Sequence, residues 1–108
     1  MKNKKILCVC RGGHVRSVAT KYCLNRRGYK EVIAVGGEYV SFDTMCILCD
    51  WADIILLAKP NHKKFIPVFT EFIDKVNLSF SIGEDTYGTP VNWKLEELID
   101  RELDKIGL

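Results

Sequence analysis

Three residues near the N-terminus carry side chains suited to nucleophilic chemistry on an anion. Cys10 is followed after five residues by Arg16, and Ser17 comes next. A cysteine thiolate is a strong nucleophile, and the planar guanidinium of an arginine matches the oxygens of a phosphate-like group. A serine hydroxyl beside the sulfur could stabilise it as a leaving group. The spacing therefore predicts a nucleophile that faces a bound oxyanion.

The residues in between predict a loop that holds this anion. Gly12 and Gly13 follow a short apolar run and precede a helical pattern. Glycines let the backbone curl so that successive N–H groups point inward, and the helix N-terminus adds partial positive charge. Such a field favours the thiolate form of Cys10. The residues expected to line the bound anion are Arg11, Gly12, Gly13, His14, Val15 and Ser17.

The remainder of the chain alternates between strand and helix patterns. Strands are predicted at 5–9, 31–35, 53–58 and 76–82, and helices at 16–27, 43–51, from about Pro67, and at 95–106. This order favours a three-layer α/β/α fold with a four-stranded parallel sheet. The loop of residues 10–17 then lies between the first strand and the first helix, at the edge where such sheets bind ligands. A turn is expected at 61–64, with His62 decorating a helix start.

Length and composition limit the alternatives. The 108 residues have the size of one domain, so 1–108 is expected to form a single domain. A net charge of +2 is too small to indicate a nucleic-acid or polybasic membrane partner. No apolar run approaches the roughly 20 residues of a membrane span. We expect a cytoplasmic monomer with reduced thiols.

The motif from Cys10 to Ser17 resembles the C-x5-R-S loop of the low-molecular-weight protein tyrosine phosphatases. That family places the loop after its first strand and a general-acid aspartate, commonly in Asp-Pro-Tyr, near the C-terminus. Asp85-Thr86-Tyr87 is similar, and residues 52–56 resemble the family's Ala-Asp-leucine-rich strand. The resemblance is close at these three places.

The resemblance implies a mechanism in two steps. Cys10 attacks phosphorus while Asp85 protonates the leaving phenol, and Asp85 then activates water against the cysteinyl phosphate. Arg16 and the loop amides stabilise the phosphoryl oxygens, so neither metal nor cofactor is needed. Tyr39 and Tyr87 are implied at the substrate rim, and Glu84 is the rival acid. The expected substrate is a phosphorylated protein or a small aryl phosphate.

Two departures from the family loop affect its rigidity and its redox protection. Gly13 stands where the family usually has asparagine, and Val15 stands where it has a second cysteine. The chain is also shorter between its second and third strands, where residues 37–39 are all that is left of the family's recognition rim. Substrate choice is therefore the least transferable property.

The other cysteines leave a second enzyme class open. Five cysteines in all fit a closed disulfide framework poorly. Cys8 and Cys23 are predicted as core residues. Cys46 and Cys49 share a predicted apolar helix face with Phe42 and Met45, which favours a core position, and no pattern of zinc ligands accompanies them.

Arsenate reductases on the same scaffold use two further cysteines as redox relays, so an arsenate reductase is one alternative. A module that binds a phosphopeptide without cleaving it is another. A phosphocarrier similar to cysteine IIB sugar-transport components is a third, although Arg16 and Asp85 favour hydrolysis.

Overall fold

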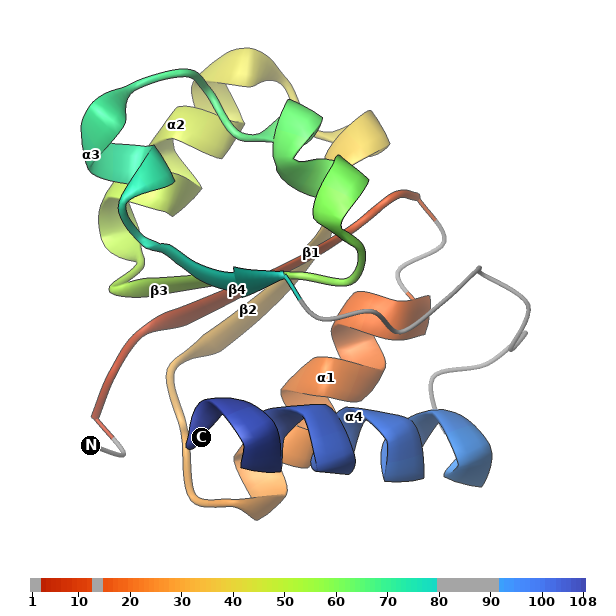
Figure 1. Cartoon of the computed structure of the whole chain (residues 1–108). Helices are drawn as coiled ribbons and strands as arrows, with labels where there is room; N and C mark the ends of the chain where they lie inside the picture. The colour runs from red at the N-terminus through yellow and green to blue at the C-terminus, as the bar shows by residue number, and fades with distance from the viewer. Residues whose placement is uncertain (1–2, 13–14, 80–91) are drawn as a thin grey trace.

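A parallel sheet with helices against both of its faces frames the molecule (Figure 1). The computed structural model describes residues 3–12, 15–79 and 92–108. Its elements, in chain order, are β1 (Ile6–Cys10), α1 (Val15–Arg26), β2 (Val32–Gly36), the 3-10 helix η1 (Gly37–Tyr39), α2 (Phe42–Trp51), β3 (Ile54–Leu57), the 3-10 helix η2 (Pro60–Phe65), α3 (Thr70–Ile73), β4 (Val76–Ser79) and α4 (Trp93–Ile106). The predicted α/β class and parallel sheet are confirmed.

Strand β1 lies inside the sheet, whose order is β2-β1-β3-β4. Its five residues are all buried, as the apolar sequence ILCVC requires of a strand with neighbours on both sides. Val9 is paired with Val35 of β2 and with Leu57 of β3. The carboxyl ends of these three strands therefore meet at one edge, where β1 continues into the loop of residues 10–17.

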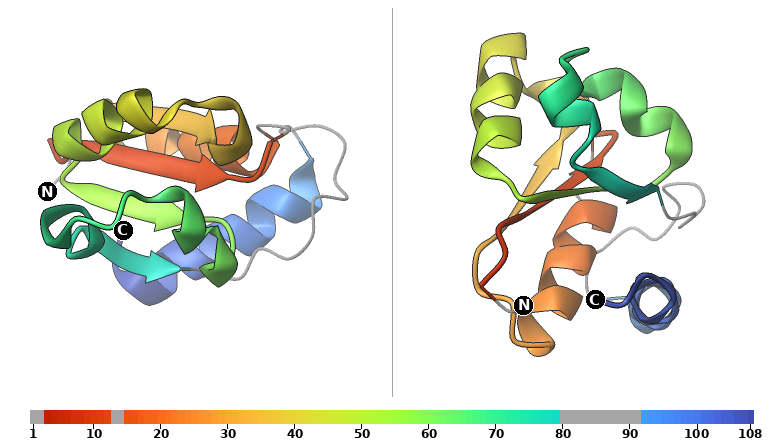
Figure 2. Two further views of the ribbon diagram at one scale, coloured as in Figure 1. Left: turned by 90° about the horizontal axis from the view of Figure 1, so that it is seen from above. Right: turned by 60° about the vertical axis from the view of Figure 1, so that its left-hand side comes forward.

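Side-chain alternation along β1 divides the core between the two faces of the sheet. Ile6, Cys8 and Cys10 pack in a cluster with residues of α1 and α4. Leu7 and Val9 pack in a second cluster with residues of α2, η2 and α3. The two views in Figure 2 show these helix groups on opposite sides of the sheet. Cys10 therefore faces the side that α1 covers.

Helix α1 is held against the sheet by α4. Leu95, Ile99 and Leu103 of α4 are fully buried in the cluster that also contains Ala19 and Cys23 of α1. The side chain of Asn92 caps α4 by accepting from the backbone N–H groups of residues 94 and 95. This packing fixes the N-terminal turn of α1 over the end of β1.

Several boundaries differ from the sequence prediction. β1 and β2 each begin and end one residue later than expected, so Cys10 is the last residue of its strand. The predicted turn at 61–64 is part of η2. The helix expected from about Pro67 begins only at Thr70, because Phe69 is extended at φ −103° and ψ 134° and forms the N-cap of α3. The predicted strand 76–82 is observed for 76–79, and its remainder lies outside the described residues.

The prediction that Phe42 belongs to the apolar core face of α2 is wrong. Phe42 is 62% exposed, whereas Met45 and Cys49 are buried and Cys46 is half-buried. Phe42 is the first residue of the helix, and its ring packs at the surface with its centroid 6.4 Å from that of Phe69. In the part of the chain that the structure describes, no helix has the length and apolar character needed to cross a membrane.

Candidate functional site

The end of β1 and the first turn of α1 bring together the three residues of the motif. The Cys10 thiol donates to Ser17 Oγ over 3.1 Å, and both residues are buried. If the sulfur is ionised, the direction reverses and the Ser17 hydroxyl donates to it. Arg16 is 2% exposed and lies in the first turn of α1, next to Ser17 in the chain. A thiol at the end of β1 thus contacts a hydroxyl of the first turn of α1, and the same turn carries a buried arginine.

Helix η1 fixes the start of the loop. The N–H of Glu38 donates to the carbonyl of Arg11 over 2.9 Å, and Arg11 Nε donates to the Glu38 carboxylate over 2.8 Å. The backbone and side chain of Arg11 are therefore both held by one residue that lies 27 positions away. The sequence did not reveal Glu38, since nothing in its spacing links it to the loop.

Glycines allow η1 and η2 to pack closely around the loop. A Cβ atom on Gly36 would lie 2.7 Å from the carbonyl oxygen of Gly12, and one on Gly37 would lie 2.3 Å from Cγ of Phe65. Any side chain at either position would force its neighbours apart. The junction of β2 and η1 therefore contacts both the loop, at Gly12, and the Phe65 side chain at the end of η2.

The ring of Tyr39 lies beside Gly12 of the loop. A Cβ atom on Gly12 would be 3.0 Å from the Tyr39 ring, so the ring lies against the loop backbone. At the same time Tyr39 is 76% exposed. An exposed aromatic ring beside an anion loop can stack on the organic part of a ligand.

His62 is buried at the same edge, which corrects the expectation that it decorates a helix start. It is 3% exposed, its ring centroid is 5.8 Å from that of Phe65, and its Nδ1 has no hydrogen-bond partner among the described residues. Burial and nearby positive charge together lower the pKa of His62 to about 4, and burial is the larger cause. These charges belong to Arg16, Lys59, Lys64 and Arg11.

The sequence held a signal for this position that the analysis did not use. Residues 62 and 65 are three apart, and a 3-10 helix has three residues per turn. A proline that opens such a helix, as Pro60 does, places His62 and Phe65 on one inward face.

The remaining cysteines are thiols without a disulfide. Burial raises the pKa of Cys8 far above its usual range, with a further contribution from Cys10. Burial also raises the pKa of both Cys23 and Cys49 to about 11, helped by Asp100 in the first case and by Cys46 in the second. Three of these thiols are thus held in the unreactive protonated form, which agrees with the predicted core positions.

Several predicted site residues fall outside the described part of the chain. They are Gly13, His14, Asp85 and Tyr87, together with the rival acid Glu84. Val15 is described, and it is half-buried at the start of α1, where it packs against the cluster that contains Cys10. The structure therefore describes the nucleophile and the arginine of the predicted site.

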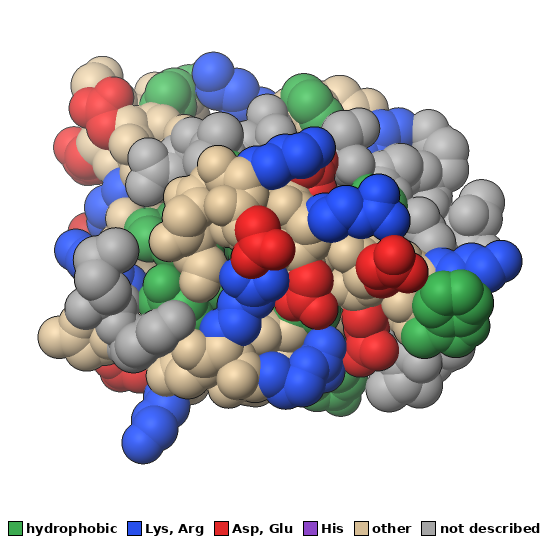
Figure 3. All heavy atoms as spheres, turned by 60° about the horizontal axis from the view of Figure 1, so that its bottom comes forward, with side chains coloured by type: hydrophobic (Ala, Val, Ile, Leu, Met, Phe, Trp, Pro, Cys, Tyr) green, Lys and Arg blue, Asp and Glu red, His purple; other side chains and the backbone are tan. Residues whose placement is uncertain are grey.

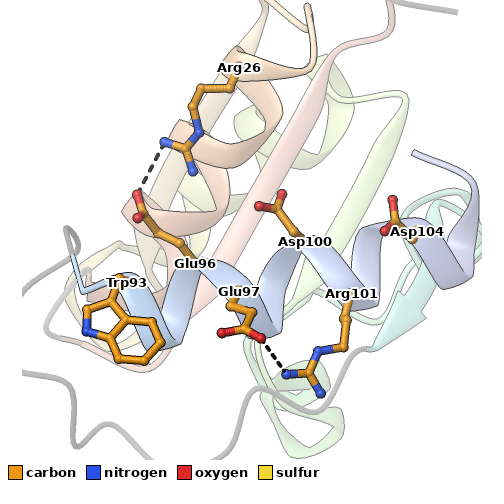
Figure 4. A pocket seen from close by; sticks show the side chains of 7 residues that line it. All are labelled: Arg26, Trp93, Glu96, Glu97, Asp100, Arg101 and Asp104. Atoms are coloured by element: carbon orange, nitrogen blue, oxygen red, sulfur yellow. Dashed lines mark hydrogen bonds and ion pairs between the residues drawn. The ribbon is translucent and has the colours of Figure 1, made fainter.

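A groove of about 670 Å³ lies elsewhere, between the C-terminal part of α1 and the outer face of α4 (Figure 4). Its lining residues are Arg26, Trp93, Glu96, Glu97, Asp100, Arg101 and Asp104. Acidic and basic side chains are interleaved over this face (Figure 3), and Glu96 and Glu97 pair with Arg26 and Arg101. Within residues 3–12, 15–79 and 92–108, no group of three or more His, Cys, Asp or Glu side chains could hold a metal ion.

The arrangement at the end of β1 can hold an oxyanion against a buried sulfur. Comparisons of this chain with protein-family models, with curated proteins and with solved structures found no match.

Proposed function

We propose that this protein is a cysteine-dependent phosphatase that hydrolyses phosphotyrosine or similar aryl phosphate monoesters. The observation that carries this proposal is the 3.1 Å contact between Cys10 and Ser17 beside the buried Arg16. A buried thiol, a hydroxyl donor and a guanidinium at one helix N-terminus form a site for a phosphoryl group next to a nucleophile. In this proposal the chain is a short form of the low-molecular-weight tyrosine phosphatase scaffold, with a three-layer, four-stranded arrangement and one domain.

In the first chemical step the Cys10 thiolate attacks phosphorus. The S–P bond forms as the bond from phosphorus to the phenolic oxygen breaks, and Asp85 gives its proton to that oxygen. Arg16 and the loop N–H groups bind the three other phosphoryl oxygens, whose charge grows in the transition state.

In the second step water attacks the phosphorus of the cysteinyl phosphate. Asp85, now ionised, takes a proton from the water as the P–O bond forms and the S–P bond breaks. The Ser17 hydroxyl donates to the departing sulfur, so the thiolate of Cys10 is restored for the next cycle. Inorganic phosphate is the second product.

The other cysteines support hydrolysis over redox relay. Arsenate reduction needs two further thiols that can attack and form disulfides, and a thiol with a pKa of about 11, as for Cys49, is a poor nucleophile at neutral pH. The proposed nucleophile acts as a free thiol, so we place the protein in a reducing compartment such as the cytoplasm.

Hydrolysis of p-nitrophenyl phosphate by the purified protein tests the proposal. We expect turnover that disappears in Cys10→Ser and slows in Asp85→Ala, while Cys10 of Asp85→Ala still reacts with iodoacetate. Cys49→Ser is the matched control, because it removes a buried thiol of the other core cluster. Wild-type protein that binds phosphopeptide without turnover between pH 5 and 7.5 would instead be a binding module.

A further inference from the structure

The end of β2 and the start of η1 hold the beginning of the loop through backbone contacts. Cys10 and Gly36 form the last pair of the ladder between β1 and β2. Just beyond that pair, the N–H of Glu38 donates to the carbonyl of Arg11 over 2.9 Å. The carbonyl of Arg11 is therefore turned toward η1.

The direction of this carbonyl fixes the direction of the next amide. The peptide between Arg11 and Gly12 is trans, and in a planar trans peptide the C=O and N–H groups point in opposite directions. The N–H of Gly12 therefore points away from η1. In the proposed phosphatase, N–H groups of this loop bind phosphoryl oxygens, so the orientation of this amide affects the affinity for the anion.

The side chain of Glu38 reinforces the same attachment. Its Oε1 accepts from Arg11 Nε over 2.8 Å, and a Cβ atom on Gly12 would lie 3.5 Å from its Oε2. The side chains of Arg11 and Glu38 are 68% and 40% exposed, so their ion pair adds little to the stability of the whole protein. Two bonds from one residue to Arg11 nevertheless resist rotation of the peptide that follows it.

A carboxylate at this position has two opposite effects on a bound anion. Its negative charge repels the anion, and this effect alone would make the affinity rise when the carboxylate is removed. Its bond to Arg11 helps to hold the Gly12 amide in one orientation, and this effect alone would make the affinity fall. The sign of the change in affinity therefore distinguishes the two effects.

We propose that Glu38 is a positioning residue of the anion loop, which acts through Arg11 to keep the Gly12 N–H directed to a phosphoryl oxygen. The inference rests on the proposed phosphatase function and adds to that site a residue from outside the C-x5-R-S motif. It also changes the role of Arg11. The Arg11 guanidinium, engaged by Glu38, anchors the loop, whereas Arg16 binds the phosphoryl group.

Binding of inorganic phosphate to Cys10→Ser, measured by titration calorimetry, tests the sign. This protein lacks the nucleophile, so the affinity is measured without turnover. In this background we expect Glu38→Ala to weaken phosphate binding by about threefold to tenfold. Glu38→Gln keeps an oxygen that can accept from Arg11, so it should weaken binding less. Glu97→Ala is the matched control, because Glu97 makes an exposed ion pair with Arg101 over 3.2 Å, and it should leave the affinity unchanged.

A double substitution connects the effect to Arg11. If Glu38 acts through this arginine, Glu38→Ala should no longer weaken phosphate binding once Arg11→Ala is present. Both side chains are exposed, so circular dichroism should show that all these variants are folded. Tighter binding in Glu38→Ala, an unchanged affinity, or an equal loss with and without Arg11→Ala overturns the inference.

Failure of the proposed function appears separately. If phosphate binding depends on Glu38 as described but the wild-type protein does not hydrolyse p-nitrophenyl phosphate, the phosphatase is overturned and the positioning role stands. If turnover disappears in Cys10→Ser but phosphate binding is indifferent to Glu38, the positioning role is overturned and the phosphatase stands. Phosphate binding too weak to measure in every variant also overturns the positioning role.

Discussion

The loop of residues 10–17 and the groove between α1 and α4 are built from the same helix, α1, but they place their charges differently. At the groove, carboxylates of α4 pair with guanidinium groups over about 3 Å, and most of these side chains are well exposed. At the loop, the Cys10 thiol donates to the Ser17 hydroxyl, and Cys10, Ser17 and Arg16 are all buried. The groove is a large hollow whose charges are matched by the protein itself. The residues of the motif are instead buried beneath the surface at the end of β1.

In the proposed phosphatase, the reactive site is located by a cysteine at a helix N-terminus and not by the largest hollow described here. Surface ion pairs contribute little and create no reactive group. A helix N-terminus combined with a nucleophile creates both an anion site and a reactive atom. Variants matched between the two regions can test the contrast.

The largest expected effect comes from exchanging an arginine for lysine in each region. Arg16→Lys keeps the charge but loses the planar fork that binds two phosphoryl oxygens, so kcat/KM for p-nitrophenyl phosphate should fall by about 10²–10³. Arg26→Lys, in the groove, should leave kcat/KM unchanged. Comparable losses in both variants would mean that the two regions are not functionally distinct.

Acid should destabilise the edge beside the loop through His62. Its pKa is lowered in the folded protein, from about 6.5 to about 4, so the unfolded state binds more protons between these values. Stability should therefore fall as the pH drops from about 6.5 to about 4, by up to about 3 kcal/mol. Urea unfolding of wild type and His62→Phe across this range measures it. In His62→Phe, the free energy of unfolding should no longer show this fall between about pH 6.5 and pH 4. His14 is present in both proteins, so its contribution cancels when the two are compared.

Two glycine-to-alanine substitutions should have different effects. One crowds the contact between η1 and η2, and the other strains the backbone at the end of α4. Gly37→Ala places a Cβ atom 2.3 Å from the Phe65 ring, so we expect a loss of about 1–3 kcal/mol and a reduced turnover as η1 and η2 move apart. Gly107→Ala meets no atom within 4 Å but must adopt φ +80°, which costs about 1 kcal/mol. Its turnover should be normal. Chemical denaturation with parallel activity assays distinguishes the two, and normal turnover in Gly37→Ala would show that this contact does not support the site.

The smallest effects concern the ion pairs at the α1–α4 contact. Arg27 donates to the carbonyl of Asp100 and to the Asp104 carboxylate, both over 2.9 Å, and its side chain is 22% exposed. Arg27→Ala should cost about 1–2 kcal/mol. Arg101 is 67% exposed and pairs with Glu97 one turn away, so Arg101→Ala should cost less than about 0.5 kcal/mol. Thermal unfolding in low and high salt measures both losses of stability. Equal losses would contradict the expectation that the less exposed arginine contributes more.

The local features of the site follow from neighbouring residues and could be read in the chain. A run of five apolar residues predicts a buried strand, and glycines followed by a helical pattern predict its turn into α1. Cys10 and Ser17 meet because they lie seven positions apart in the chain, at the end of one element and in the first turn of the next. These contacts depend on short-range geometry, which the order of residue types largely specifies.

The predictions failed where distant segments decide burial. Phe42 has the spacing of a core residue, but it opens its helix at the surface, where its ring lies near that of Phe69. His62 looks like a surface residue among lysines, but η2 folds over the end of β3 and encloses it. Neither outcome can be obtained from periodicity alone, because each depends on which segment packs against the element.

By itself the sequence determined the α/β class, the parallel sheet and the place of Cys10, Arg16 and Ser17 where the first strand passes into the first helix. Only the tertiary structure decided that Glu38 holds Arg11, that Gly36 and Gly37 leave space for Gly12 and Phe65, and that His62 is buried among positive charges. The physical reason is the range of the interactions. Strand and helix patterns arise from neighbours within a few residues, whereas the electrostatics of the site arise from charges that the sheet brings together from distant parts of the chain.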